Sequence, residues 1–333
     1  MAAAAAAAAF EGGQCQYTMG DQDRRFFGEP EETLHSANLL APPGDDHQFR
    51  VSQLISWSDL QIVSQINEGS FGEVFLARYR GEEVSVKRCK LGPNAAMTTD
   101  QFRNLESEIN TCRKLDHPNI VKYIGFSLVH PNFAIVMEYM PNGNLFDLLY
   151  MQRVNLPAAI RLKISCQLAV GVAYMHNCDP IVIHRDLKTQ NMVLDVNYNI
   201  KLCDFGKSHA WDGDCILADQ DLQGYSAPEC FHPNGRITEK VDIWSLGCCL
   251  VEVFGGPLPY EEVPLMQQVC ELINRRVPPL VPPWFTPQVQ PMFCGCFDFE
   301  PDRRIEISEV QLALKRLTPE ELERYGMDKR RTR

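Results

Sequence analysis

HRDLKTQN occupies residues 184–191 of this chain, and DFG follows at residues 204–206. Between them, short apolar segments on either side of a turn predict two paired strands. Such a hairpin places Asp186, Asn191 and Asp204 at its ends, where their side chains can converge on one point. The two stretches therefore predict a shared polar site.

The three side chains suit the chemistry of phosphate transfer. Asp204 and Asn191 offer hard oxygen ligands of the kind that Mg²⁺ takes up together with a phosphate. Asp186 is left to accept or orient a hydroxyl proton. A polar hairpin that spells the same string by chance is the alternative, and it is disfavoured because partner motifs lie elsewhere in the chain in the right order.

Both stretches resemble the catalytic loop and the metal-binding loop of protein kinases. The resemblance runs from about Trp57 to Leu317 in unbroken motif order, and residues 57–60 and Lys188 look like those of the tyrosine-kinase-like group of serine/threonine kinases. It implies an α+β fold of two lobes, with an antiparallel N-lobe sheet and one helix, followed by a mostly helical C-lobe. The implied cofactors are ATP and Mg²⁺, and the implied partner is a protein substrate.

A glycine-rich hairpin begins the predicted nucleotide site. Alternating apolar residues on both sides of residues 69–72 favour two strands joined by a loop. Its glycines let backbone N–H groups approach phosphates. Asn67 stands where the family has a further glycine, and because Asn tolerates unusual φ and ψ angles, we expect a stiffer loop that still works.

The next strand and helix supply a charged pair. Period two puts Ser85 and Lys87 on one face of a strand, and Lys87 resembles the kinase lysine that grips the α- and β-phosphates. Most kinases have Ala at the position of Ser85, beneath the adenine. Glu108 lies on the buried face of the helix predicted over residues 99–115 and is the expected partner of Lys87. Glu106 is the alternative.

A buried strand over residues 133–139 leads to the second lobe. By resemblance, Met137 closes the back of the adenine pocket, and Glu138 and Met140 offer backbone C=O and N–H to the adenine edge. The resemblance implies these nucleotide-binding residues: Ile66, Asn67, Gly69, Ser70, Phe71, Gly72, Val74, Ser85, Lys87, Met137, Glu138, Met140 and Val193. It implies that the catalytic residues are Asp186, Lys188, Lys87 and Glu108 and that the metal ligands are Asn191 and Asp204.

Two carboxylates are expected to organise the second lobe. Residues 240–254 are apolar nearly all round, which predicts a buried central helix. Asp242, near its start, resembles the family aspartate that holds the catalytic-loop backbone. Glu229, in an Ala-Pro-Glu match to the end of the activation segment, should pair with Arg304, and Arg303 is the competing partner.

The segment between DFG and Ala-Pro-Glu departs from the family pattern. Leu222 replaces a threonine that touches the catalytic Asp and Lys in serine/threonine kinases, and its side chain cannot make those hydrogen bonds. The choice between Ser/Thr and Tyr acceptors therefore stays open. Arg185 precedes the catalytic Asp, and Asp219 or Asp214 is expected to neutralise it in place of a phosphate. The alternative is that these aspartates are solvated loop charges.

Composition limits the other classes of function. Of 333 residues, 45% are hydrophobic, as in a soluble globular protein, and the net charge of −11 argues against a nucleic-acid-binding surface. No apolar run approaches the ~20 residues that span a bilayer. The 13 cysteines have no zinc-type spacing, and their odd number without a signal peptide predicts a reducing compartment and a cytoplasmic protein.

The predicted organisation has four parts. Residues 1–56 form a low-complexity, disordered segment, 57–140 the kinase N-lobe, 141–318 the C-lobe and 319–333 a polar basic tail. The predicted function is the ATP-dependent phosphorylation of Ser/Thr hydroxyls of protein substrates in signalling. A pseudokinase that acts as a nucleotide-binding scaffold and a kinase of small molecules are the rival interpretations. The oligomeric state is left open.

Overall fold

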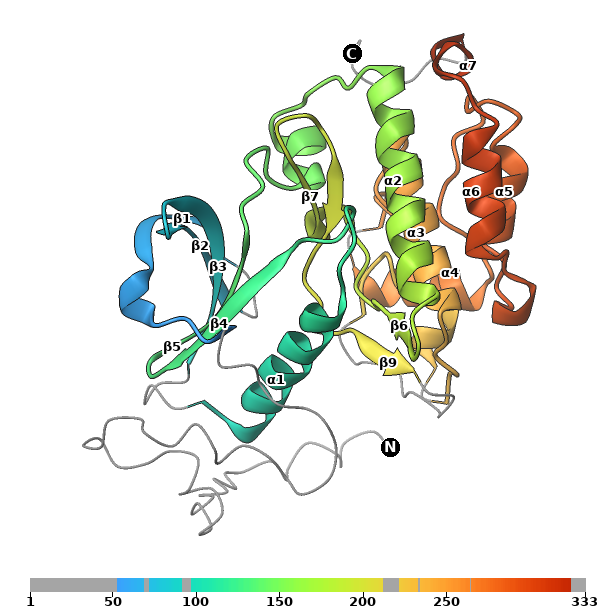
Figure 1. The fold of residues 1–333 in the computed structure, drawn as a ribbon. Helices are drawn as coiled ribbons and strands as arrows, with labels where there is room; N and C mark the ends of the chain where they lie inside the picture. The colour runs from blue at the N-terminus through green and yellow to red at the C-terminus, as the bar shows by residue number, and fades with distance from the viewer. Residues whose placement is uncertain are drawn as a thin grey trace, which may run out of the picture. The chain divides into compact units, whose positions relative to one another are not determined.

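The computed structural model describes residues 53–68, 72–91, 97–211, 222–232, 234–263 and 265–324. A sheet forms before residue 140, and helices dominate after it (Figure 1). The strands are β1 (Gln61–Glu68), β2 (Gly72–Tyr79), β3 (Glu82–Cys89), β4 (Tyr123–Val129), β5 (Asn132–Glu138), β6 (Ile181–Ile183), β7 (Met192–Leu194), β8 (Ile200–Leu202) and β9 (His209–Trp211). The helices are α1 (Thr99–Lys114), α2 (Ala158–His176), α3 (Lys240–Val253), α4 (Met266–Asn274), α5 (Gln290–Cys296), α6 (Ile307–Lys315) and α7 (Pro319–Arg324).

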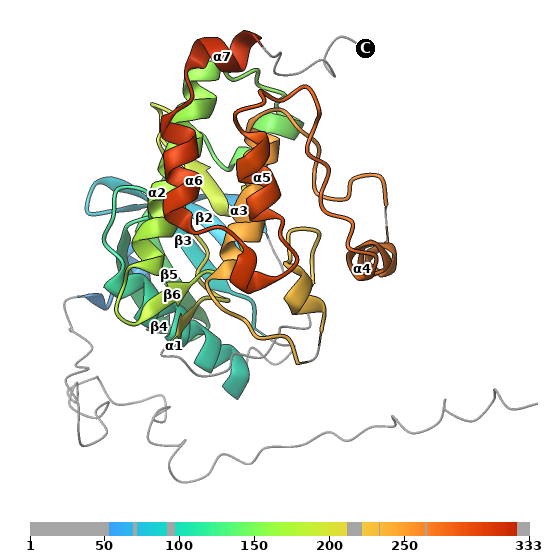
Figure 2. The ribbon, with the colours of Figure 1, turned by 90° about the vertical axis from the view of Figure 1, so that its right-hand side faces the viewer.

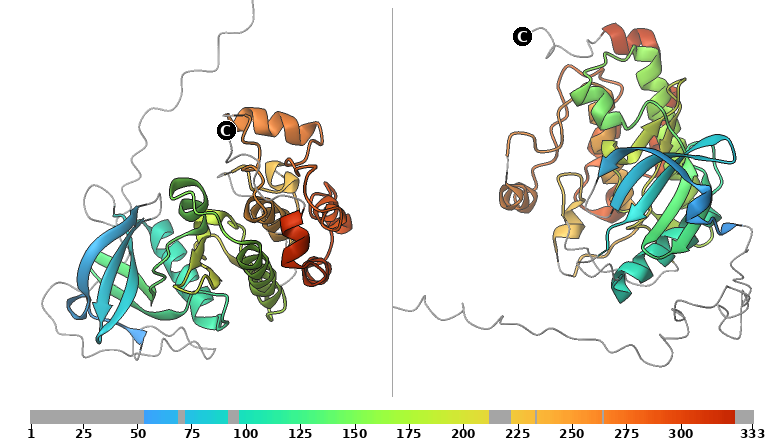
Figure 3. Two further views of the ribbon diagram at one scale, coloured as in Figure 1. Left: turned by 90° about the horizontal axis from the view of Figure 1, so that it is seen from above. Right: turned by 90° about the vertical axis from the view of Figure 1, so that its left-hand side faces the viewer.

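The first five strands form one antiparallel sheet in the order β1-β2-β3-β5-β4. On β3 the buried side chains alternate, with Val84 and Val86 on one face, as a period of two requires. On β5 four consecutive residues, 133–136, are buried, so both faces of that strand are covered. β2 and β3 pair without a bulge, which sets Lys87 opposite Val74. α1 lies beside this sheet (Figure 3), so the predicted N-lobe of one sheet and one helix is confirmed.

The packed part of the N-lobe begins earlier than Trp57, the predicted boundary. Ile55 is 2% exposed, and its backbone N–H donates to the carbonyl oxygen of Phe126 at 2.8 Å. Gly125 makes room for it, because a Cβ there would lie 2.4 Å from the carbonyl oxygen of Gln53. The segment before Trp57 is too short to show a periodic pattern of apolar residues. Its packing also depends on Gly125, which is far away in the sequence.

α1 begins with a capping box. The side chain of Thr98 accepts from the N–H of Gln101 at 3.2 Å, and the side chain of Gln101 accepts from the N–H of Thr98 at 2.9 Å. Leu105 and Ile109 are buried along one side of the helix, and Glu108 is buried with them. The apolar stripe therefore holds Glu108 in the interior.

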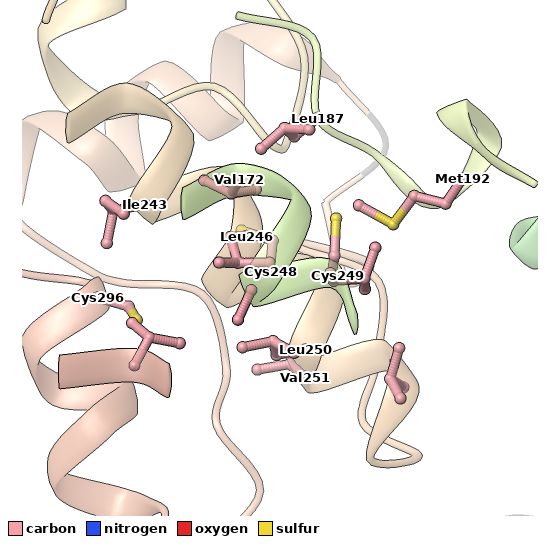
Figure 4. Close-up of a cluster of buried hydrophobic side chains, with 14 of the residues drawn as sticks. Val172, Leu187, Met192, Ile243, Leu246, Cys248, Cys249, Leu250, Val251 and Cys296 are labelled. Atoms are coloured by element: carbon pink, nitrogen blue, oxygen red, sulfur yellow. The ribbon is translucent and has the colours of Figure 1, made fainter. Parts of the chain in front are cut away.

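α3 is the buried central helix that its composition predicts. Each residue from Lys240 to Val253 is buried, and α3 lies beside α2 and α5 (Figure 2). Figure 4 shows its side chains among those of α2, the catalytic loop, β7 and α5, and labels Ile243, Leu246, Cys248, Cys249, Leu250, Val251, Val172, Leu187, Met192 and Cys296. Burial raises the pKa of the Cys248 and Cys249 thiols, so they pack as small neutral side chains.

α2 is the one helix in the described part of the chain that is long and apolar enough by length and composition to cross a membrane. It carries Arg161 and Lys163, so it is not an uninterrupted apolar run and does not contradict the expectation from the sequence. Its residues Ile164, Leu168 and Val172 are 0% exposed within the C-lobe core. The core helix of a globular domain meets the same criteria of length and composition, because both need long apolar helices.

The predicted C-terminal tail starts with a packed helix. α7 contacts α2, and its Leu322 is 5% exposed. A single buried leucine among charged residues gives no periodic signal, which is why the sequence pattern did not extend the C-lobe this far. Residues 325–333 lie outside the described residues.

Glu229 and Arg304 form the buried ion pair predicted from the sequence. Two guanidinium nitrogens of Arg304 donate to the two carboxylate oxygens of Glu229 at 2.7 and 2.9 Å, and the Arg304 side chain is 0% exposed. Arg304 also donates to the carbonyl oxygens of Lys240 and Asp298. Arg303, the alternative partner, is exposed and pairs with Asp298 instead.

We predict that Glu229→Ala lowers the free energy of unfolding by ~3–5 kcal/mol, because it leaves the Arg304 charge buried without its partner. Arg303→Ala is the matched control, and its exposed side chain should change stability by less than about 0.5 kcal/mol. Denaturant unfolding of the three proteins checks this. Equal stability of Glu229→Ala and the unsubstituted chain would contradict it.

Candidate active site

A cleft of about 240 Å³ is lined by strands of the sheet, the end of β5 and the catalytic and metal-binding loops. Most of the residues predicted to bind nucleotide line it, namely Ile66, Asn67, Val74, Ser85, Lys87, Met137, Glu138, Met140 and Val193. The metal candidates Asn191 and Asp204 line it too. Gly72 is the first residue of β2 and is not among the lining residues. Gly69, Ser70 and Phe71 lie outside the described residues.

Other residues line the cleft without having been predicted. They are Val121, Tyr139, Pro141, Gly143, Asn144, Asp147, Gln190 and Cys203. Gln190 and Cys203 could have been predicted from the sequence, because each directly precedes a predicted metal ligand. The rest carry no motif and reach the cleft only through the path of the chain between the two lobes.

Lys87 bridges two carboxylates from different parts of the chain. Its Nζ lies 2.7 Å from Glu108 Oε1, on α1, and 2.7 Å from Asp204 Oδ1, after β8. The predicted pairing of Lys87 with Glu108 is therefore present, and Glu106 is not the partner. The bridge connects the sheet, its helix and the metal-binding loop at the cleft.

Burial and charge together set the ionisation of this cluster. Burial acts to lower the pKa of Lys87, but the charges of Asp204 and Glu108 outweigh it and hold that pKa well above its ordinary value. Burial raises the pKa of Glu108, and the charge of Lys87 offsets this only in part. The pKa of Asp204 is lowered, because the attraction of Lys87 outweighs burial. A cation and an anion thus face the cleft at neutral pH.

Two residues of the site hold a left-handed backbone conformation. Asp204 has φ 64° and Arg185 has φ 65°, which non-glycine residues rarely adopt and which cost of order 1–3 kcal/mol each. Asp204 is held by Lys87, and Arg185 by a hydrogen bond from its N–H to Asp242 Oδ1 at 2.9 Å. Buried charges therefore stabilise the strained backbone on both sides of the site.

Asp242 fixes the catalytic loop, as its position predicted. Besides the N–H of Arg185, it accepts the N–H of His184 at 2.8 Å and contacts His176 Nε2 at 3.0 Å. Asp242 is 0% exposed, yet its pKa is lowered, because His176 and the loop N–H groups outweigh the burial that would raise it. Its partners satisfy a carboxylate that would otherwise be costly to bury.

The catalytic candidates meet around one carboxylate. Asp186 is 9% exposed, and its Oδ2 lies 2.9 Å from Lys188 Nζ and accepts from Asn191 Nδ2 at 2.9 Å. Lys207 Nζ lies 3.8 Å from Asp186 Oδ1. Asp186 is therefore an oriented carboxylate surrounded by cations.

The donor set fits a divalent metal shared with phosphate. Nδ2 of Asn191 donates to the backbone oxygen and to Oδ2 of Asp186, both at 2.9 Å, so Oδ1 of Asn191 is the atom left for a ligand. Asp204 supplies a carboxylate on the same cleft. Within the described residues no group of three His, Cys, Asp or Glu side chains could hold a metal alone. Such a pair of oxygen ligands suits Mg²⁺, which uses few protein ligands and completes its shell with phosphate and water.

At the end of the cleft where adenine is expected, the side chain of Ser85 makes a hydrogen bond that an alanine could not make. Ser85 Oγ donates to the carbonyl oxygen of Glu138 at 3.1 Å. The carboxylate of Glu138 also accepts from Lys201 Nζ at 2.6 Å and from the N–H of Lys122 at 2.6 Å. Ser85 and the two lysines therefore restrain the strand end that is expected to meet the base.

The side chain of Leu222 cannot hydrogen-bond the catalytic pair, as its chemistry predicts, but the next residue does. Gln223, the next residue, donates from Nε2 to Asp186 Oδ1 at 3.3 Å and accepts from Lys188 Nζ at 3.3 Å. A longer side chain one position further along reaches the same two groups. The prediction about Arg185 stays untested, because Asp214 and Asp219 lie outside the described residues.

A buried carboxyl group joins the catalytic loop to the segment that follows Gln223. Glu252 of α3 accepts from Tyr225 Oη at 2.7 Å and from Thr189 Oγ1 at 3.0 Å. Glu252 is 2% exposed, and burial raises its pKa from 4.5 to about 8, although both hydrogen bonds act to lower it. Near neutral pH the folded protein therefore binds a proton that the unfolded chain releases.

This proton makes stability depend on pH. Because the pKa of Glu252 is higher in the folded state, its contribution is complete below about pH 4.5 and is lost as the pH rises through about 8. We predict that the melting temperature of Glu252→Gln, which has no group to ionise, falls less than that of the unsubstituted chain over this interval. Parallel melting curves for the two proteins across this range would contradict the assignment.

Comparison with known proteins agrees with this geometry. Residues 60–313 match the family model for the protein kinase domain. The chain is 30% identical over 270 residues to the probable serine/threonine-protein kinase drkA of Dictyostelium discoideum, which covers 81% of this chain and 41% of drkA. It is 32% identical over 268 residues to the probable serine/threonine-protein kinase SIS8 of Arabidopsis thaliana, which covers 79% of this chain and 25% of SIS8. The chain thus spans less than half the length of either relative, and through its protein kinase domain it belongs to the protein kinase family.

Proposed function

We propose that this chain is an ATP- and Mg²⁺-dependent kinase that phosphorylates Ser or Thr hydroxyls of protein substrates. The observation that carries the proposal is the meeting of Asp186, Lys188 and Asn191 within hydrogen-bonding distance. Asn191 also lines the cleft that holds Lys87 and Asp204. The serine/threonine kinases among its relatives support the choice of acceptor hydroxyl.

Each residue has one role in this proposal. Lys87, oriented by Glu108, binds the α- and β-phosphates, and Asp204 with Asn191 holds the metal, which supplies charge neutralisation when bound. Asp186 orients the acceptor hydroxyl and accepts its proton. Lys188 neutralises charge on the transferred phosphate. The residues that line the cleft, from Ile66 to Val193, surround the nucleotide in this proposal.

The remaining expectations from the sequence enter here as part of the proposal. The boundary between the N-lobe and the C-lobe lies after residue 140. The partner is a protein in a signalling process, and the protein acts in the cytoplasm. The described cysteines are free thiols, which accords with a reducing compartment.

Phosphotransfer to a peptide library tests the function. Full-length protein is incubated with Mg·ATP and Ser-, Thr- and Tyr-containing peptides, and phosphate incorporation is measured, with Asp204→Asn as the control for contaminating kinases. Incorporation into Ser or Thr peptides, lost in the control, supports the proposal. Nucleotide binding without any phosphotransfer favours the pseudokinase scaffold instead, and phosphotransfer confined to Tyr peptides contradicts the acceptor assignment.

We predict that Lys87→Met and Asp186→Asn each lower kcat by about 10²-fold or more, because both groups stabilise the transition state. Both variants should remain folded, since Lys87 lines the cleft, Asp186→Asn keeps the shape of the side chain, and neither residue belongs to the apolar core. Lys315→Met and Asp302→Asn are matched controls at exposed positions and should leave turnover unchanged. Turnover within a few-fold of the unsubstituted chain in either cleft variant would rule out the assigned role.

A further inference from the structure

We propose that Gln223 is a positioning residue for phosphate transfer, an inference that rests on the proposed function. Its amide makes two hydrogen bonds at once: Nε2 donates to Asp186 Oδ1 at 3.3 Å, and Oε1 accepts from Lys188 Nζ at 3.3 Å. Lys188 Nζ also contacts Asp186 Oδ2 directly at 2.9 Å, so Gln223 lies beside an ion pair. A carboxylate cannot donate and an ammonium cannot accept, so a side chain that bonds both groups of the pair must both donate and accept. Among neutral side chains, amides and hydroxyls can do so.

Each oxygen of Asp186 has its own amide donor. Asn191 donates to Oδ2, whereas Gln223 donates to Oδ1. Lys188 Nζ contacts both oxygens, at 3.2 Å from Oδ1 and 2.9 Å from Oδ2. Because an amide holds each oxygen, the carboxylate plane is fixed relative to Lys188. An acceptor hydroxyl that approaches Asp186 therefore meets a defined lone-pair direction, which is the requirement for proton acceptance in the transition state.

The backbone that carries Gln223 is itself anchored. The N–H of Gln223 donates to Ser226 Oγ at 3.0 Å, and the N–H of Ser226 donates to the carbonyl oxygen of Gln223 at 3.0 Å. Ser245 of α3 donates to the carbonyl oxygen of Tyr225 at 2.8 Å. This short turn is thus tied to the most buried helix of the C-lobe, which gives the Gln223 amide a fixed origin.

A close backbone contact holds the same turn from the other side. A Cβ on Gly224 would lie 2.9 Å from the carbonyl oxygen of Pro259, so any larger residue there would displace the turn. Tyr225 completes the anchoring through its hydrogen bond to the buried Glu252. Gln223 therefore links a turn that is anchored to α3 with Oδ1 of Asp186 through its side-chain hydrogen bond.

The proposal predicts an effect on turnover and not on nucleotide binding. Gln223→Ala should lower kcat for peptide phosphorylation about ten- to a hundredfold, since it removes two hydrogen bonds to charged groups. The KM for ATP should stay within about twofold, because Gln223 does not line the cleft. Gln223→Glu, nearly the same in shape, keeps the acceptor but loses the donor when ionised, and should also lower kcat. Gln268→Ala, at an exposed glutamine of α4, is the matched control.

Rescue distinguishes positioning from simple packing. In the Gln223→Ala background, Leu222→Thr supplies a hydroxyl one residue earlier and should recover at least part of the lost kcat. Two results would overturn the proposal and leave the proposed function standing. One is an equal kcat for Gln223→Ala and the unsubstituted chain. The other is a loss of kcat in Gln223→Ala that comes with an equal rise in the KM for ATP. A loss of kcat in Gln223→Ala that Leu222→Thr does not reverse and that Gln223→Glu does not share would also overturn it. An unsubstituted chain that phosphorylates no peptide overturns the proposed function and this inference together.

Discussion

The buried carboxylate of Asp242 is the constraint on which the active site depends. It lies at the start of α3, the most buried helix, and accepts the N–H groups of His184 and Arg185. An unpartnered carboxylate at 0% exposure would cost several kcal/mol, so the catalytic loop and the helix stabilise each other. The left-handed conformation of Arg185 persists because these bonds over-determine it.

From this anchor, polar contacts extend outward to the cleft. Asn191 and Gln223 hold the two oxygens of Asp186, and Lys188 bridges to Gln223. Lys87 connects the metal-binding loop to α1 through Asp204 and Glu108. The charges that chemistry requires are therefore the same charges that join the sheet to the helical part, and their ionisation follows from that pairing more than from burial alone.

Polar groups deep in the C-lobe serve a related purpose. Glu229 accepts hydrogen bonds from Arg304, and Glu252 accepts hydrogen bonds from Tyr225 and Thr189. Each pair connects a loop to α3 or to its flanks. Because such groups are costly without partners, they specify one arrangement of loops that apolar packing by itself would leave open.

Much of this could be predicted from the sequence, because motif residues at fixed spacing must meet for the chemistry to work. The position of Glu108 beside Lys87 follows from the buried face of its helix. The pairing of Glu229 with Arg304 and the role of Asp242 were implied by the resemblance of their motifs to those of protein kinases, and the structure shows both. The register of the β7–β8 hairpin likewise follows from alternation.

Only the tertiary structure decided the contacts that depend on side-chain reach and on residues distant in sequence. Gln223 reaches Asp186 although the family position beside it is Leu222, and no local pattern encodes the length of that reach. Ile55 docks only because Gly125 leaves space, and the proton of Glu252 is held only because α3 is buried on every side. The periodicity of apolar residues predicts which face of a helix or strand is buried. Which residues pack against that face is decided only when the chain folds.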